Sequence, residues 1–195
     1  MGALLRLEKR FAQDRVLSEA YCEFIAEYLR LGHMALVTQD QEQNQSTYYL
    51  PHHAVVKLSS TTTKLRVVFN ASQNTTSGVS LNDLLHIGPK TQNDVFSILL
   101  HWRLFPYVYT ADIEKMFRQI VVDEQHTDFQ RILWRFSPED QNKSYRLLTV
   151  TYGTACAPYL ACRTLRQLFS ICTHEICPVI TINIIWDTPS RDKSF

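Results

Sequence analysis

No stretch of this 195-residue sequence contains the roughly 20 consecutive apolar residues of a membrane-spanning helix, which excludes a spanning segment. Residues 1–10 alternate leucine with charged side chains, so they lack the apolar core of a secretory signal. No internal repeat is present either. Hydrophobic residues make up 45% of the chain and charged residues 20%, and this balance excludes full-length disorder and predicts a globular protein.

An excess of one charge is also missing, because 20 basic residues are balanced by 19 acidic ones. Near neutrality identifies no partner, since a local basic groove can be hidden inside a balanced total. Cysteine is scarce, with five residues in the chain. An odd number of cysteines without a secretory signal favours reduced thiols over a disulfide framework, which predicts an intracellular, cytoplasmic protein.

The apolar pattern predicts a mixture of helices and strands. Helices are expected at 14–31, 91–103 and 158–171, and strands at 48–58, 64–69, 107–110, 119–122, 131–136 and 145–150. Asp14 is expected to cap the first helix, Thr91 and Asp94 to form a capping box on the second, and Pro158 to begin the third. Because strict βαβ alternation is absent, this order predicts an α+β fold with a largely antiparallel sheet.

Three short segments could carry chemistry, and each also has an ordinary structural explanation. Asp112 follows an apolar strand, where a carboxylate can reach a metal ion, although Asp often serves turns at such places. Lys64 and Arg66 share one face of a strand, which suits a triphosphate but equally a solvated outer face. The small residues of 152–158 (YGTACAP) allow a ligand to approach the backbone, or simply form a tight strand-to-helix junction.

Taken together and in order, five segments resemble the reverse transcriptase of Pao/BEL-type LTR retrotransposons. They are 48–53 (YYLPHH), 65–69 (LRVVF), 80–85 (SLNDLL), 110–117 (TADIEKMF) and 151–155 (TYGTA). The resemblance covers about 5–168, and five motifs in the family's order make it specific. It implies the fingers and palm of a right-hand polymerase in the DNA/RNA polymerase superfamily. The N-terminal helix and loop of the fingers would occupy 1–47, the fingers and palm core 48–188, and a divergent tail 189–195.

The resemblance also implies roles for individual residues. Asp112 would be the first metal-binding carboxylate of the palm, and Ile113 would add its carbonyl oxygen, so that the two hold Mg²⁺ or Mn²⁺. Arg66 and Lys64 would contact the incoming deoxynucleoside triphosphate. Phe117 would be the aromatic gate that excludes a ribose 2′-hydroxyl by its bulk.

Four further residues would border the nucleic acid in such a polymerase. Tyr152 and Gly153 would line the surface that faces the nucleotide and the template. Lys57 would lie along the template strand, and Pro158 would contact the template from the start of the palm helix. The implied partners are an RNA or DNA template with its primer and deoxynucleoside triphosphates, with no membrane; the sequence gives no indication of an oligomeric state.

Two departures from the family pattern affect this interpretation. Asn70 stands where the family usually has Asp, and an Asn there can still hydrogen-bond locally. The Tyr-x-Asp-Asp motif, which supplies two further metal carboxylates, is absent; 184–188 resembles the strand that leads into it, and 189–195 stands in its place. The expectation is therefore an RNA-directed DNA polymerase fragment of the two-metal type that is inactive as an isolated chain. A non-catalytic nucleic-acid-binding remnant and an interaction module with a polymerase-like fold remain the alternatives.

Other metal-ligand candidates are weaker. His52 and His53 are adjacent, so on a strand they face opposite sides and cannot share one ion. Cys172 and Cys177 flank His174, but this cluster has no fourth ligand nearby and is interpreted as ordinary thiols. The three tryptophans are expected in the core or at an interface.

Overall fold

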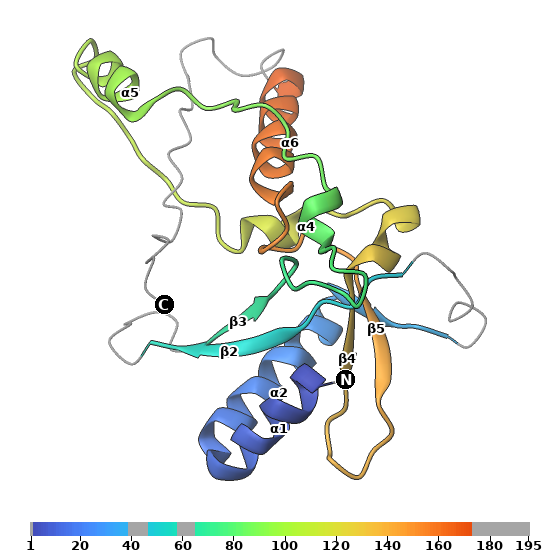
Figure 1. The fold of residues 1–195 in the computed structure, drawn as a ribbon. Helices are drawn as coiled ribbons and strands as arrows, with labels where there is room; N and C mark the ends of the chain where they lie inside the picture. The colour runs from blue at the N-terminus through green and yellow to red at the C-terminus, as the bar shows by residue number, and fades with distance from the viewer. Residues whose placement is uncertain (1, 39–46, 58–64, 173–195) are drawn as a thin grey trace.

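The computed structural model describes residues 2–38, 47–57 and 65–172, and Figure 1 shows how their helices and strands are arranged. The α-helices are α1 (Gly2–Gln13), α2 (Arg15–Arg30), α4 (Leu81–Leu84), α5 (Val95–Trp102) and α6 (Ala157–Cys172). The strands are β1 (Met34–Leu36), β2 (His52–Val56), β3 (Leu65–Phe69), β4 (Arg131–Trp134) and β5 (Lys143–Leu147), and the 3₁₀ helices are η1 (Met116–Gln119) and η2 (Glu124–Gln130). No helix within these ranges has both the length and the apolar character of a membrane span.

The strands form two small antiparallel sheets. β5 lies between β1 and β4, and β2 pairs with β3 in a register that sets His52 opposite Phe69. Side chains alternate along β2, so His52 is buried while His53 is exposed, as the sequence predicted. The two sheets are joined by an isolated bridge between Tyr49 and Arg131. The predicted α+β class with antiparallel strands is confirmed.

Two N-terminal helices cover one side of the sheets. In α2, Leu17, Tyr21, Ile25 and Tyr28 recur at steps of three and four and are buried, and the Asp14 carboxylate accepts a 2.9 Å hydrogen bond from the Leu17 amide. Both features follow the prediction for 14–31. The sequence analysis missed α1, because its charged residues separate the leucines. Leu4 and Leu7 nevertheless lie one turn apart and are buried, as the helical period requires.

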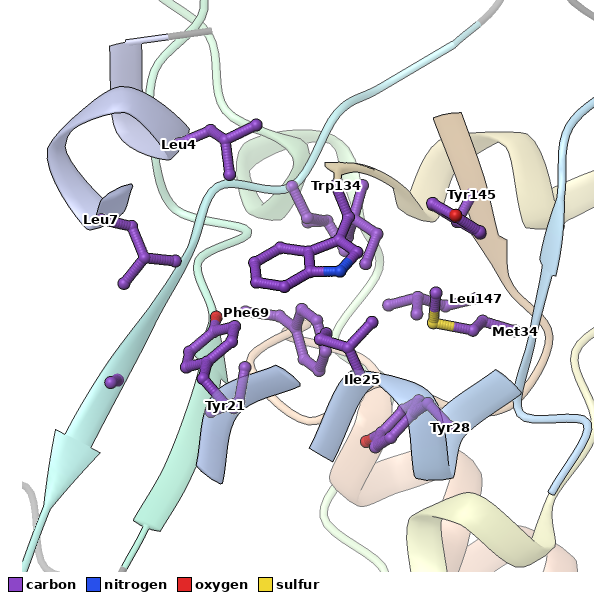
Figure 2. Close-up of a cluster of buried hydrophobic side chains, with 14 of the residues drawn as sticks. Leu4, Leu7, Tyr21, Ile25, Tyr28, Met34, Phe69, Trp134, Tyr145 and Leu147 are labelled. Atoms are coloured by element: carbon purple, nitrogen blue, oxygen red, sulfur yellow. The ribbon is translucent and has the colours of Figure 1, made fainter. Parts of the chain in front are cut away.

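The main core lies between α2 and the strands, and Figure 2 shows Trp134 at its centre. Trp134 is 1% exposed, and its ring stacks on Tyr21 with the ring centroids 5.4 Å apart. Phe69 and Ile25 complete this layer from β3 and α2. The predicted core position of Trp134 is confirmed, whereas Trp186 lies outside the described residues. Burying such large rings contributes several kcal/mol and fixes how α2 sits on β3 and β4.

Several predicted elements differ in the structure. Residues 107–110 form no strand: Tyr107 and Tyr109 are 78% and 90% exposed, so this segment has no buried face to stabilise an extended conformation. In the polymerase interpretation, this strand would end at Asp112 and pair antiparallel with a strand at about 179–187, which lies outside the described residues. Residues 119–122, which were also expected to form a strand, make one isolated bridge, between Val121 and Thr149.

The helix expected at 91–103 is also shorter than predicted. α5 begins at Val95, because the Asp94 carboxylate accepts hydrogen bonds from the Ser97 amide and hydroxyl, at 2.9 and 2.6 Å. Asp94 is thus the N-cap itself rather than the third residue of a box opened by Thr91. α6 starts at Ala157, so that Pro158 lies within its first turn, where the missing amide hydrogen costs nothing.

Candidate functional site

The junction at 151–155 is packed directly against the end of β3. Gly153 has φ +99°, and a Cβ atom at this position would collide with the carbonyl oxygen of Phe69. An L-residue would therefore be strained twice, by its backbone conformation and by the contact. The glycine that the sequence interpretation assigned to the nucleotide-facing surface is required by the close approach of two backbone segments.

Asn82 holds this junction in place from α4. Its side-chain nitrogen Nδ2 donates to the Gly153 carbonyl at 3.0 Å and to the Ser72 hydroxyl at 2.8 Å, and its Oδ1 accepts from the Ala155 amide at 2.8 Å. α4 is short, but a capping box between Ser80 and Asp83 fixes its first turn. One amide side chain thus joins α4 to the segment after β3 and to the 151–155 junction. Asn82 belongs to the 80–85 motif, but the sequence did not indicate this bridging role. Only the contacts with Ser72 and with the 151–155 junction in the folded chain reveal it.

Tyr152, also assigned to the nucleotide-facing surface, directs its hydroxyl into the protein. The hydroxyl donates to the Val67 carbonyl of β3 at 2.6 Å, and the ring lies 5.5 Å from that of Phe69. Tyr28 and Arg118 lie beside the phenol of Tyr152, and burial is the main cause that raises its pKa. The hydroxyl of Tyr152 therefore ties the 151–155 junction to β3.

Asp112 and Ile113 lie in an exposed segment without regular secondary structure. The Asp112 carboxylate accepts a 2.9 Å hydrogen bond from the Ile113 amide. Among the residues that the structure describes, no three His, Cys, Asp or Glu side chains lie close enough together to hold a metal ion. Asp187 and Asp192, two carboxylates near the place where the family has its Asp pair, lie outside those residues. Metal binding by Asp112 and Ile113 therefore stays a prediction.

Phe117 follows in the 3₁₀ helix η1 and is half-buried. It packs against a small cluster formed by Met116 together with Ala161 and Leu165 of α6. The aromatic side chain proposed as a gate is therefore anchored on α6. This contact with α6 fixes the position of the ring, which an uncovered loop would not do.

The turn between Asp112 and Phe117 is held by α2. The Lys115 ammonium lies 2.7 Å from Oε1 of Glu27, and Nη1 of Arg118 lies 3.7 Å from the same oxygen. The hydrogen bond from Lys115 is the main cause that lowers the Glu27 pKa. Arg118 also stacks over Tyr28, 4.3 Å from the ring centroid. No sequence signal marks Glu27, because it lies far from this turn along the chain.

The predicted cationic residues lie on the outer face of the β2–β3 pair. Arg66 is exposed opposite Val55, and Lys57 is exposed just beyond the end of β2. Lys64 lies outside the described residues, so its expected place beside Arg66 stays a prediction. Asn70 follows β3, and its Oδ1 accepts a 3.1 Å hydrogen bond from the Ser72 amide, the local bond that the sequence predicted.

Pro158 lines a separate cavity beside the junction. The cavity has a volume of about 190 Å³ and lies between the segment 87–92 and the start of α6. Gly88 and Tyr159 both line the cavity. They lie so close together that a Cβ atom on Gly88 would run into the ring of Tyr159. Gly153 and Pro158 thus lie on the same strand-to-helix connection, whereas Asp112 lies on an exposed segment.

Comparison of the sequence with known protein families and with curated proteins finds no match.

Proposed function

We propose that this chain is the fingers-and-palm part of a reverse transcriptase of the Pao/BEL type, and that on its own it binds primer–template without extending it. The observation that carries the proposal is the bridge made by Asn82, which joins the motif 80–85 to the motif 151–155. Segments that resemble one family and lie far apart in the sequence thus meet at one place in the fold.

The other motifs surround the same place. The 65–69 motif is β3, whose Phe69 carbonyl touches Gly153, and the 48–53 motif reaches it through the Pro51 carbonyl, which accepts from the Asn70 amide at 2.7 Å. The 110–117 motif is followed by Arg118, which lies beside Tyr152. A shared centre of this kind supports a single functional unit rather than five unrelated similarities.

In this proposal the exposed face of β2 and β3 contacts the polyanion. Arg66 and Lys57 present two cations to solvent there, and Arg in particular matches phosphate oxygens with two parallel hydrogen bonds. Phe117, anchored on α6, supplies a flat surface at the edge of the nucleotide.

The absence of catalysis in the isolated chain is proposed from the donor set. Asp112 is the one carboxylate that the resemblance assigns to the metal site among the described residues, and a single carboxylate leaves Mg²⁺ mostly hydrated and weakly held. Binding needs only the cations, so it does not depend on a complete metal site.

Binding is tested first, by fluorescence anisotropy of a labelled primer–template with an overhanging template strand. The wild-type chain is expected to bind in a salt-dependent manner, and Arg66→Gln to bind several-fold more weakly. Arg15→Gln is the matched control, because Arg15 is an exposed cation on α2 that pairs with Glu19. If the wild-type chain shows no salt-dependent binding, the proposed function is wrong.

Catalysis is tested by primer extension with Mg²⁺ or Mn²⁺, beside an Asp112→Asn chain. We expect no incorporation above the level of that variant. Extension by the wild-type chain that Asp112→Asn abolishes would mean that another carboxylate completes the metal site, and the chain would then be an active polymerase.

A further inference from the structure

A cavity of about 310 Å³ lies between α1 and the start of β2. Its polar lining comes from Arg6 and Arg10 of α1, from His53 of β2, and from Asn70 and Gln73 in the segment after β3. We call it the α1–β2 cavity. Neither the motifs of the sequence nor the site described above includes the two arginines.

The cavity concentrates positive charge. Arg6 and Arg10 are one helical turn apart and share a face of α1, and like charges at this spacing repel each other. Arg10 uses one guanidinium nitrogen to donate to the Ala54 carbonyl at 3.1 Å, which covers the open edge of β2. In the part of the chain that the structure describes, no ion pair involves either arginine, and no carboxylate lines the cavity.

The cavity also continues onto the exposed face of β2 and β3. His53 lines it and points to the same side of β2 as Val55, and Val55 lies opposite Arg66. Lys57 follows at the next position on that side. With a rise of about 3.4 Å per residue, His53 and Lys57 are roughly 13 Å apart along the strand. This length spans several phosphates of a nucleic-acid strand.

We propose that the α1–β2 cavity binds a backbone phosphodiester of the nucleic acid, at one end of a cationic track that continues over Arg66 and Lys57. The proposal rests on the proposed function and extends its contact surface to α1. Two guanidinium groups can hold phosphate oxygens with paired hydrogen bonds, and an anion would also relieve their mutual repulsion. Such contacts position the strand and carry no sequence preference.

The test measures how the affinity for a labelled primer–template changes between about 50 and 200 mM salt. Each lost phosphate contact is expected to reduce the slope of log K against log salt by roughly 0.7–0.9, so Arg6→Gln should remove about one such step and Arg6→Gln/Arg10→Gln about two. Lys9→Gln/Arg15→Gln is the matched control, since it also removes two exposed cations from α1 and α2 but neither lines the cavity. The control should keep the wild-type slope.

The outcomes separate the two proposals. If the wild-type chain binds and the double variant keeps its slope, the cavity is not a phosphate site and the proposed function stands. If the wild-type chain does not bind at all, both proposals are wrong. Should the double variant fail to fold because it loses the bond to Ala54, Arg6→Gln decides the question alone, since it leaves that bond intact.

Discussion

Asn82 and Gly153 are joined by a 3.0 Å hydrogen bond from Nδ2 to the glycine carbonyl, across a sequence separation of 71 residues. The Oδ1 atom of the same side chain accepts a hydrogen bond from the Ala155 amide, so Asn82 binds the 151–155 junction on both sides of Thr154. This contact fixes the one place where the backbone of the 151–155 junction touches β3. The geometry of the proposed nucleotide-facing surface therefore depends on an amide side chain that makes no contact with a ligand.

Asn82→Ala is expected to lower the free energy of unfolding by about 1–3 kcal/mol, because it leaves the Gly153 carbonyl and the Ala155 amide without their partner. Asn82→Asp should cost less, since it keeps the Oδ1 acceptor for the Ala155 amide and loses only the donor. Urea unfolding measures both values. Asn93→Ala, at an exposed position before α5, is the control and should lie within about 0.5 kcal/mol of the wild type. Equal stability of all the chains would contradict the bridge.

Gly153→Ala should be far more costly than Gly32→Ala, although both glycines have positive φ. Gly32 has φ +70° with no atom within 4 Å of an added Cβ, so alanine there pays only the left-handed strain of about 1–2 kcal/mol. At Gly153 the Cβ also meets the Phe69 carbonyl, and the cost should reach at least about 3 kcal/mol. Comparable losses in thermal or urea unfolding would show that the loop moves away without penalty.

What could be predicted from the sequence was local. The period of three and four placed Tyr21 and Ile25 of α2 in the core, and the alternation of a strand placed His52 and His53 on opposite faces. The prediction of a strand at 107–110 was wrong, because apolar residues in a sequence do not show whether another element buries them. Tyr109 is exposed in the structure. A hydrophobic pattern predicts a strand only where another element covers it.

The contacts that build the candidate site could not be predicted, because they join distant segments. Nothing near Glu27 in the sequence indicates that its carboxylate holds Lys115. In the sequence, Arg6 and Arg10 are two charges in a leucine-rich segment, and only the packing of α1 on β2 brings them to a cavity. The resemblance drew attention to five segments, whereas the side chains that join these segments could be found only in the fold.

Lys115 is the one non-glycine residue with positive φ in the described part of the chain, at φ 51° and ψ 34°. Lys115→Ala and Lys115→Gly both remove the partly exposed pair with Glu27, which is worth less than about 1 kcal/mol. Their difference therefore isolates the backbone, and the glycine variant should be more stable by about 1 kcal/mol. At Glu19 in α2 the order should reverse, with alanine better than glycine. The same order at both positions, measured by urea unfolding, would argue against a left-handed Lys115.

The buried side chain of His52 makes the stability of the core depend on pH. Its Nε2 lies 3.0 Å from the Leu133 carbonyl, which can only accept, so Nε2 carries the proton and Nδ1 accepts from the Tyr21 hydroxyl at 2.6 Å. The imidazole is therefore neutral in the folded core, and its burial is the main cause that lowers its pKa. A proton on Nδ1 would point a second donor at a hydroxyl that is already donating.

We expect the free energy of unfolding to fall as the pH is lowered from about 7 to 5. Because the folded pKa of His52 lies below the value of about 6.5 in the unfolded chain, the unfolded state binds a proton in this window that the folded state does not, and each pH unit costs up to about 1.4 kcal/mol. Above that window the contribution is fully present. His52→Gln removes the titration and should flatten the profile, even if the variant is less stable at pH 7.

Burial also lowers the pKa of His33, so a remaining slope should disappear in the variant that carries His33→Gln as well. Urea unfolding at each pH gives the profiles, and parallel curves for the wild type and His52→Gln would exclude His52 as the source.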